Sequence, residues 1–472
     1  MKDDVQKSDA LVLFGATGDL AKKRLWPAVY EIHKRGNLGI PVIGVSSSDW
    51  DDDTMRARAR EDVAQRDDFD PKVFDELAPT MTYCAGDYRD DSTFQDLATR
   101  LEGKEHPLFY LAIPPSLFDD VTAGLAKAGV NTGGRVVVEK PFGRDLESAV
   151  ELNEVLHRGF AEEDVYRIDH FLGKEPISNL MVFRFANSML EPVWNRRYIK
   201  RIQITMAEEF GVGTRGKFYD SVGTIRDVVQ NHILEIIALL GIEPPVANDA
   251  QALRDEKLRL YRQMPAWEPE DLVRGQYRGY ENEEGVQGGS ETETFVAFKF
   301  EIDSWRWAGV PWLVRAGKSM ATTATEAVVE FNAPPRMLFA PDDAPVPAPN
   351  RLIFQLGNQG GIELRMQAKA PGDEMQTREV ELEVDHRELF AGEVDAYDRL
   401  IEDALFGDPR RFGQADLVEQ QWRIVQPLLD APPPIDLYHE GTWGPRSADG
   451  LAAPYGGWHD PEPDLEGANP GD

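Results

Sequence analysis

The first part of the chain alternates short apolar runs with stretches of helical periodicity. Residues 11–14, 41–45, 109–113 and 135–139 are mostly apolar runs of four or five residues. Apolar runs of this length, separated by helices, are typical of strands in a parallel sheet that is covered on both faces. The pattern predicts an α/β domain over residues 1–170, of the Rossmann-like kind that binds dinucleotides.

After about Asp169 the pattern changes. Alternating apolar and polar residues in the later strands suit a sheet with one covered face. We therefore expect an α+β domain over residues 171–472, built on a large and mainly antiparallel sheet. Its expected elements are a helix over 174–189, a strand over 199–206, a long helix over 221–240, and strands over 293–301 and 327–331.

Two segments show neither the periodicity of a helix nor the alternation of a strand. Residues 332–351 are rich in proline and acidic residues, which predicts a loop. From Ala452 onward proline, glycine and aspartate dominate, which predicts a flexible tail of about the last 20 residues.

Composition narrows the possible environments and partners. No run approaches the roughly 20 apolar residues of a membrane helix, and the N-terminus lacks an apolar signal segment. The single cysteine, Cys84, excludes an internal disulfide framework and a cysteine-based zinc site. These features predict a cytoplasmic protein. The net charge of −32 opposes binding to nucleic acid and to anionic membranes, so a phosphate site must be a local cluster of cations.

A glycine-rich turn follows the first predicted strand. Gly15, Gly18 and Ala21 have the spacing Gly-x-x-Gly-x-x-Ala, which differs from the usual Gly-x-Gly-x-x-Gly. Glycines at this place let the backbone approach a pyrophosphate, whose charge the following helix N-terminus favours. The pattern alone also fits a turn that merely joins a strand to a helix. Its position in an α/β pattern favours a dinucleotide site.

Three strings of residues carry a resemblance to a known family. Residues 15–24 (GATGDLAKKR), 167–175 (RIDHFLGKE) and 223–235 (GTIRDVVQNHILE) resemble segments of the glucose-6-phosphate dehydrogenase family, and the resemblance extends from Leu11 to Pro445. It implies oxidation of glucose 6-phosphate at C1 to the 6-phosphogluconolactone, with hydride transfer to NADP or NAD. That reaction is the first step of the oxidative pentose phosphate pathway.

The resemblance also assigns roles to residues. It implies that His232 is the general base and that Asp169 orients it. A histidine suits this role because its unperturbed pKa lies near working pH. If residues 167–175 are helical, His170 and Lys174 lie four apart on one face and can grip one phosphate. The implied substrate residues are Lys140, His170, Lys174, Glu208, Asp227 and Lys318, and the implied cofactor residues are Gly15, Thr17, Gly18, Asp19, Leu20, Ser47 and Lys140.

The sequence departs from the family pattern at a few positions. Ser47 stands where the family usually has an arginine for the 2′-phosphate of NADP, and a serine lacks that charged bidentate grip. We expect weaker discrimination between NADP and NAD. Phe171 replaces a tyrosine, and Thr323 and Ala324 stand where some members carry basic residues. Both changes weaken phosphate contacts.

Alternative interpretations stay open at this point. One is an NAD-preferring or broader hexose dehydrogenase of the same family, and another is a catalytically silent regulatory paralogue. As an isolated residue, His232 fits a buried core histidine, and each charged residue fits a surface position. We expect no metal site, and we expect a homodimer or homotetramer that associates through the large half-exposed sheet.

Overall fold

The computed structural model describes residues 6–335, 339, 348–357, 360–385 and 394–462. The chain divides into two compact units, each of which is described by itself. Unit 1 comprises Met1–Lys174, Val246–Arg254 and Val394–Glu419, and unit 2 comprises Glu175–Pro245, Asp255–Glu393 and Gln420–Asp472.

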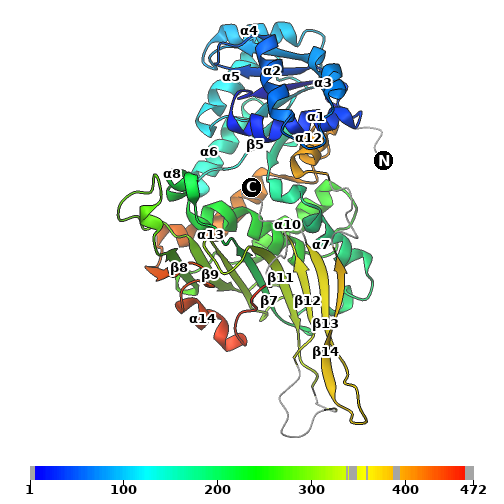
Figure 1. Cartoon of the computed structure of the whole chain (residues 1–472), viewed down its shortest axis with the longest axis vertical. Helices are drawn as coiled ribbons and strands as arrows, with labels where there is room; N and C mark the ends of the chain where they lie inside the picture. The colour runs from blue at the N-terminus through cyan, green and yellow to red at the C-terminus, as the bar shows by residue number, and fades with distance from the viewer. Residues whose placement is uncertain (1–5, 336–338, 340–347, 358–359, 386–393, 463–472) are drawn as a thin grey trace. The chain divides into compact units, whose positions relative to one another are not determined.

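Unit 1 is built around a seven-stranded sheet in the order β15-β6-β5-β4-β1-β2-β3. Neighbouring strands from β6 to β3 are parallel, and β15 is antiparallel to β6. The expected α/β fold is confirmed (Figure 1). The strands are β1 (Ala10–Phe14), β2 (Val42–Ser46), β3 (Met81–Ala85), β4 (Pro107–Leu111), β5 (Arg135–Glu139), β6 (Val165–Ile168) and β15 (Phe412–Gly413).

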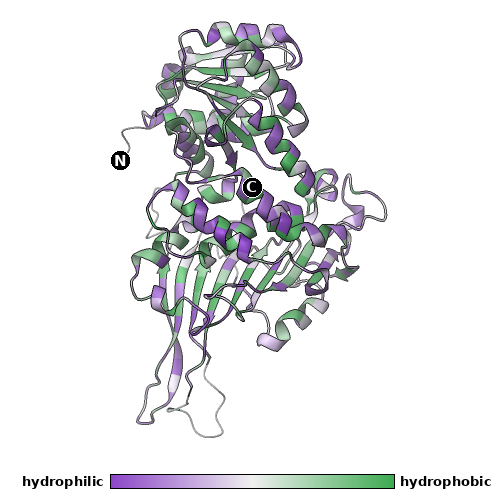
Figure 2. Cartoon of the chain, turned by 180° about the vertical axis from the view of Figure 1, so that it is seen from behind, coloured by the Kyte–Doolittle hydropathy of each residue, from purple (hydrophilic) through white to green (hydrophobic). Residues whose placement is uncertain are grey.

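Helices follow the strands of unit 1, and several of them begin at a side-chain cap. The Asp51 side chain accepts a hydrogen bond from the Thr54 amide at 2.8 Å, and Asp145 and Ser148 form a capping box. The strands are the most apolar part of the unit, as Figure 2 shows. The helices are α1 (Trp26–Lys34), α2 (Asp52–Val63), α3 (Pro71–Leu77), α4 (Asp91–Arg100), α5 (Phe118–Ala128), α6 (Leu146–His157) and α12 (Ala396–Phe406).

Helix α12 comes from late in the sequence but belongs to unit 1. Its Leu400 and Leu405 are fully buried in the same core as Leu11 and Leu13 of β1. Arg35, just after α1, forms ion pairs with Asp398 at 3.1 Å and Glu402 at 2.9 Å. The division into domains at residue 170 stays a prediction, and these contacts add a late segment to the early core.

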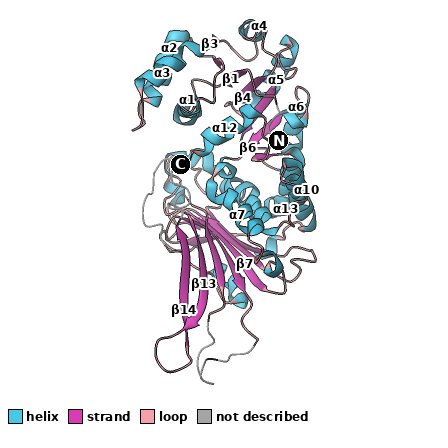
Figure 3. Cartoon of the chain, turned by 90° about the vertical axis from the view of Figure 1, so that its right-hand side faces the viewer, coloured by secondary structure: helices cyan, strands magenta, loops and turns pink. Residues whose placement is uncertain are grey.

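Unit 2 contains a nine-stranded sheet in the order β14-β13-β12-β11-β7-β10-β9-β8-β16. Among the described strands only the β7–β10 and β8–β16 pairs are parallel, so the expected mainly antiparallel sheet is confirmed (Figure 3). The strands are β7 (Ile199–Ala207), β8 (Leu272–Tyr277), β9 (Phe295–Phe300), β10 (Trp312–Gly317), β11 (Ala324–Phe331), β12 (Arg351–Gln355), β13 (Gly361–Lys369), β14 (Thr377–Asp385) and β16 (Ile435–Tyr438).

The long helix expected over 221–240 is present, but its first half is a π-helix. The π-helix η8 (Ile225–Ile233) continues directly into the α-helix α9 (Leu234–Gly241). The other described α-helices of unit 2 are α7 (Glu175–Ala186), α8 (Gly216–Asp220) and α14 (Ser447–Ala452). Two further α-helices, α10 (Ala250–Gln263) and α13 (Ala415–Asp430), each begin in unit 1 and end in unit 2. Among the described residues no helix is long and apolar enough to cross a membrane.

The flexible tail expected from Ala452 is wrong for residues 453–462. The Trp458 indole donates to the Ala448 carbonyl at 3.0 Å, and the His459 amide donates to Gln203 of β7 at 2.9 Å. These long-range contacts hold a segment whose composition alone favours a loop. Residues 463–472, and most of the loop predicted over 332–351, lie outside the described residues.

Candidate functional site

The predicted glycine turn of unit 1 has a backbone that only glycine can adopt at its first position. Gly15 has φ +79°, and a Cβ there would lie 2.2 Å from the Ala112 carbonyl oxygen. The Gly15 amide contacts the Tyr88 hydroxyl at 3.0 Å, and Gly18 N donates to Gly15 O at 2.9 Å. Gly18 and Asp19 are the exposed residues of this turn and precede the helical segment η1 (Ala21–Leu25), a position that suits a pyrophosphate.

Hydroxyl groups gather beside this turn at the end of β2. The Thr17 hydroxyl lies 2.9 Å from the Ser46 hydroxyl and 3.1 Å from the Ser48 hydroxyl. Ser47, between the two serines, is exposed, as are Gly18 and Asp19, whereas Leu20 packs partly against the core. In dinucleotide-binding folds the end of this strand faces the adenosine ribose, so a neutral hydroxyl surface is present where a cation would hold a 2′-phosphate.

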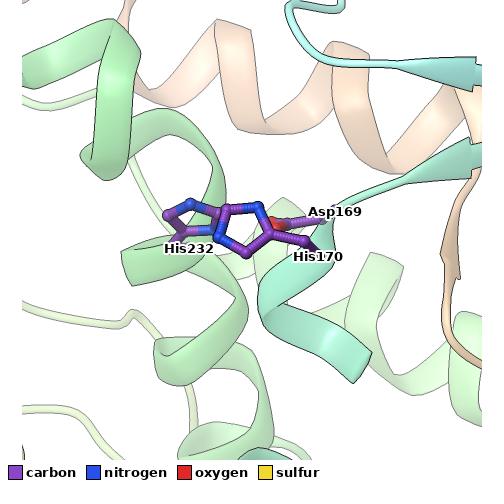
Figure 4. Close-up of side chains that lie close together, drawn as sticks. All are labelled: Asp169, His170 and His232. Atoms are coloured by element: carbon purple, nitrogen blue, oxygen red, sulfur yellow. The ribbon is translucent and has the colours of Figure 1, made fainter. Parts of the chain in front are cut away.

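Further candidate residues follow the neighbouring strands β5 and β6. Lys140 comes directly after β5, and Asp169 and His170 come directly after β6 (Figure 4). Asp169 is 5% exposed and accepts a hydrogen bond from the Phe171 amide at 3.0 Å. Ligands of open α/β sheets bind outside the carboxyl ends of the strands. Lys140, Asp169 and His170 therefore lie at the edge of the sheet where a ligand is expected.

The predicted placement of His170 and Lys174 on one α-helical face is wrong. His170–Gly173 is a short 3-10 helix, η5, and Lys174 follows it in an extended conformation with φ −75° and ψ 137°. A 3-10 helix is wound more tightly than an α-helix, and Lys174 is extended. The two side chains therefore do not take the relative direction that residues four apart have in an α-helix. The His170 ring stacks on the Tyr397 ring of α12, with centroids 6.4 Å apart and planes inclined by 4°.

In unit 2 the π-helix η8 carries Asp227 and His232. An α-helix of 3.6 residues per turn would place residues five apart about 140° from each other. The i→i+5 hydrogen bonds of a π-helix bring such residues toward one face, and π-helical turns often occur at functional sites. His232 is 5% exposed, and Figure 4 shows it on η8. The first half of the long helix expected over 221–240 therefore has the winding of a π-helix.

Side chains from distant segments hold both ends of the η8–α9 helix. At its start, the Glu293 carboxylate accepts from the Ile225 amide at 3.1 Å and pairs with Arg274 at 3.2 Å. At its end, Arg184 of α7 donates to the carbonyls of Leu239 at 2.7 Å and Ile242 at 2.9 Å. An anion at the N-terminus and a cation at the C-terminus match the helix dipole, so both contacts stabilise the position of His232.

Two tryptophans complete the C-terminal cap of α9. Trp194 and Trp307 donate to the carbonyls of Leu240 at 2.9 Å and Gly241 at 2.8 Å.

Burial lowers the pKa of the Arg184 guanidinium to about 9. Arg184 therefore keeps its charge at neutral pH.

The substrate residues expected in unit 2 meet in one small pocket. Glu208 follows β7, Lys318 follows the parallel neighbour β10, and Asp227 lies on η8. Lys318 is ion-paired with Glu208, and its ammonium lies 3.8 Å from the Asp227 carboxylate. The pocket is lined by Met206, Glu208, Tyr219, Thr224, Asp227, Val228, Gly317 and Lys318.

A strained turn sets the direction of Lys318. Ser319 has φ +49°, a left-handed conformation that non-glycine residues rarely adopt. The Glu208 amide donates to the Gly317 carbonyl at 3.0 Å, and the Met320 amide donates to the Glu208 carbonyl at 2.9 Å. The Lys318 side chain is 5% exposed, whereas Glu208 and Asp227 are about one third exposed at 32% and 29%. The two carboxylates thus present partly exposed hydrogen-bond acceptors, with a lysine behind them.

Several residues of this region were not predicted from the sequence. Glu293 and Arg184 are far from the motifs, and nothing in their local patterns marks them as helix caps. Tyr219 and Thr224 line the pocket and share a hydrogen bond of 2.8 Å. Of these four residues, Thr224 is the one that lies within the 223–235 string, so that string could have indicated it.

Comparisons with known proteins match this arrangement along nearly the whole chain. Residues 12–179 match the family model "Glucose-6-phosphate dehydrogenase, NAD binding domain", and residues 181–459 match "Glucose-6-phosphate dehydrogenase, C-terminal domain". A protein of Mycobacterium tuberculosis named "Glucose-6-phosphate 1-dehydrogenase 1" is 42% identical over 454 residues, which cover 96% of this chain and 97% of the relative.

Two solved structures are similar throughout. A crystal structure of glucose-6-phosphate 1-dehydrogenase from Mycobacterium avium is 44% identical, with a TM-score of 0.89, covering 96% of this chain and 99% of that one. A glucose-6-phosphate dehydrogenase in complex with its substrate glucose-6-phosphate is 33% identical, also with a TM-score of 0.89, covering 97% and 100%. The resemblance noted in the sequence is confirmed.

Proposed function

The chain belongs to the glucose-6-phosphate dehydrogenase family, and we propose that it oxidises glucose 6-phosphate at C1 to 6-phosphoglucono-1,5-lactone, the first step of the oxidative pentose phosphate pathway. The observation that carries this proposal is the Glu208–Asp227–Lys318 pocket beside the helix of His232, within a chain that matches the family over both parts. A relative of the same fold is solved with glucose 6-phosphate itself. This support favours the sugar phosphate over a free hexose and over a silent paralogue.

In the proposed reaction His232 removes the proton of the C1 hydroxyl. Asp169 orients the imidazole and balances the charge that it acquires, as in other histidine–carboxylate dyads. When bound, the nicotinamide dinucleotide supplies the hydride acceptor. The bond that breaks is C1–H, whose electron pair leaves as hydride, and the hydroxyl proton goes to His232. No metal is required by this balance.

The remaining residues bind and orient. We assign the phosphate to His170 and Lys174, because ionic contacts to a phosphate exceed neutral ones in strength. We assign the sugar hydroxyls to Glu208, Asp227 and Lys318, and we assign Lys140 to contacts with both sugar and cofactor. The phosphate assignment relies on the match of residues 167–175 to the family. The assignment of the sugar hydroxyls is supported by the convergence of the three side chains in one pocket.

We assign the dinucleotide to the turn of Gly15, Thr17, Gly18, Asp19 and Leu20. Gly18 is exposed and carries no side chain, which supports this fit because a pyrophosphate needs close approach to the backbone. Ser47 and the Thr17–Ser46–Ser48 hydroxyls supply no positive charge at the end of β2. We therefore propose that NADP and NAD are both used, with less preference for NADP than an arginine at position 47 would give.

The test is the initial rate of nicotinamide reduction in wild type and in His232→Ala. We expect kcat/KM to fall by about 10²–10⁴-fold, the usual contribution of a general base. His439→Ala, an exposed histidine in the same unit, is the matched control and should leave the rate unchanged. Full activity of His232→Ala would refute the assignment of the base.

The substrate is tested in the same assay with glucose 6-phosphate and free glucose, each with NADP and NAD. We expect the phosphate ester to be preferred, because His170 and Lys174 add ionic contacts that the free sugar cannot make. Equal kcat/KM values for the two sugars would favour a broader hexose dehydrogenase. Absence of reduction with every pair would favour a silent paralogue.

We also propose a cytoplasmic homodimer or homotetramer that associates through the sheet of unit 2. Along β13 and β14, apolar residues alternate with charged ones, and Met366, Leu382 and Val384 are 38%, 57% and 43% exposed. An apolar row of this kind on one face of a sheet favours contact with a second copy. Light scattering at micromolar concentration tests this, and a monomeric mass would refute it.

A further inference from the structure

A half-buried acid and a buried tyrosine lie together at the end of β5, outside the roles assigned above. Glu139 is the last residue of β5, and the Tyr110 hydroxyl of the neighbouring strand β4 donates a hydrogen bond to its carboxylate. Tyr110 is fully buried. In the parallel pairing of β5 with β6, Glu139 is opposite Ile168, so Asp169 is the next residue along. Two carboxylates therefore share the carboxyl ends of adjacent strands.

Titratable and charged side chains face Glu139 from each neighbouring element. They are Tyr110 of β4, Lys140 next in the chain, Asp169 after β6 and Tyr397 of α12. Behind Tyr397, the Arg24 guanidinium lies 5.9 Å from the ring centroid and 3.9 Å from the Asp395 carboxylate. The His170 ring stacks on the Tyr397 ring. Glu139 therefore interacts electrostatically with Asp169 and with Tyr397, the ring on which His170 stacks.

The charge of Glu139 is finely balanced. Removal from water raises the pKa of its carboxyl to about 7, against the lowering effects of the Tyr110 hydrogen bond and of Lys140, while Asp169 adds repulsion. Burial, together with Glu139, raises the pKa of the Tyr110 hydroxyl, so Tyr110 remains a donor. The carboxyl can therefore change its charge near neutral pH while the hydroxyl keeps its proton.

We propose that Glu139 is a positioning residue that acts through Asp169 and strengthens the histidine–aspartate base when its own carboxyl is ionised. This inference rests on the proposed function, in which Asp169 pairs with His232. An added negative charge near Asp169 stabilises the imidazolium that forms when the base takes a proton. Protonation of Glu139 removes that help. The hydrogen bond from Tyr110 lowers the pH at which the change occurs.

Two variants separate this role from a structural one. Glu139→Gln imitates the protonated acid, so its kcat/KM should equal that of wild type near pH 6 and fall about fivefold below it near pH 8.5. Tyr110→Phe removes the donor that favours the anion, so Glu139 should ionise at a higher pH. Its kcat/KM should dip below wild type near pH 7.5 and return to the wild-type value near pH 9.5.

A purely structural role would lower both variants by a constant factor at every pH, and that outcome would overturn the proposal. Since each substitution preserves the side-chain shape and Tyr110→Phe removes a single oxygen, the second variant tests the inference even if the first fails to fold. Val137→Ala, in the same strand, serves as a packing control and should show a pH-independent change.

A direct measurement distinguishes this inference from the proposed function. Infrared difference titration of the wild-type protein without substrate should show a protonated carboxyl band that disappears near neutral pH and is missing in Glu139→Gln. If that band titrates and His232→Ala keeps full activity, the base assignment fails and the route through Asp169 fails with it. If His232 proves to be the base but the band does not titrate between pH 6 and 8.5, the role of Glu139 alone is overturned.

Discussion

The two candidate binding regions are built from different materials. In unit 1 the turn at Gly15 presents backbone groups, and its shape depends on the absence of a side chain. In unit 2 the pocket at Lys318 presents charged side chains, and its shape depends on ion pairs and on a helix held at both ends. A region made of backbone tolerates changes in charge but not in volume, and a region made of side chains shows the reverse. Substitutions can test this contrast.

The largest effect is expected for Gly15→Ala. The new Cβ would meet the Ala112 carbonyl oxygen at 2.2 Å, and the φ of +79° disfavours any side chain. We expect kcat/KM for the dinucleotide to fall by about 10³-fold, equivalent to about 4 kcal/mol. Steady-state kinetics with varied cofactor measure this.

Gly18→Ala is the control for Gly15→Ala, because its Cβ would meet only the Gly15 carbonyl oxygen at 3.2 Å. We expect a loss of less than about tenfold for this variant. Circular dichroism establishes that both variants fold. Equal losses for the two glycines would show that flexibility of the whole turn, and not the contact with Ala112, decides cofactor binding.

The next effect is expected for Lys318→Met, which removes a charge but little volume. Glu208 and Asp227 would face each other without the ammonium, and one donor to the sugar would disappear. We expect kcat/KM for glucose 6-phosphate to fall about 10²-fold, since a charged hydrogen bond contributes about 1.5–3 kcal/mol. The dissociation constant of the dinucleotide should stay unchanged.

Lys217→Met, an exposed lysine of the same unit, is the control for Lys318→Met and should retain wild-type kinetics. A parallel loss of cofactor affinity in Lys318→Met would break the contrast between the two regions. It would mean that the pocket also orders the dinucleotide site.

A smaller effect is expected for Arg184→Met, which tests whether the helix ends support the side-chain region. The carbonyls of Leu239 and Ile242 would lose their buried donor. Each unsatisfied buried group costs at least about 1 kcal/mol, so we expect the loss of the donor to two carbonyls to lower the free energy of unfolding by about 2 kcal/mol. Urea denaturation measures this.

Arg259→Met is the control for Arg184→Met, because its side chain is 56% exposed and the change of charge is the same. It should alter the unfolding free energy by less than about 0.5 kcal/mol. An unchanged stability of Arg184→Met would show that the two tryptophans are a sufficient cap.

The smallest effect is expected for Ser47→Arg, which adds charge to the region made of backbone. An exposed arginine after β2 can reach a 2′-phosphate that the serine cannot hold. We expect the ratio of kcat/KM for NADP over NAD to rise about tenfold. Ser92→Arg, at another exposed serine of unit 1, should leave the ratio unchanged. A constant ratio in Ser47→Arg would place cofactor selectivity elsewhere.

Local patterns in the sequence were enough for strands β1, β2, β4 and β5 of unit 1, for the mainly antiparallel sheet of unit 2 and for the glycine turn. An apolar strand, a helix and a tight turn each depend on residues near in sequence, so their periods and glycines can be recognised directly. The strings around Asp169, His170 and His232 indicated the family for the same reason, since each is continuous. Strands β3 and β6 were missed because their runs are short and mixed in polarity.

The tertiary structure decided what long-range contacts determine. The π-helical winding of residues 225–233 is anchored by Glu293 at one end of the continuous helix and by Arg184 at the other, and neither has a signal in its local sequence. The pairing of Glu139 with Tyr110, and the packing of Trp458 and His459, likewise join residues far apart in the chain. Such contacts depend on which surfaces meet after folding, so the period of hydrophobic residues cannot specify them.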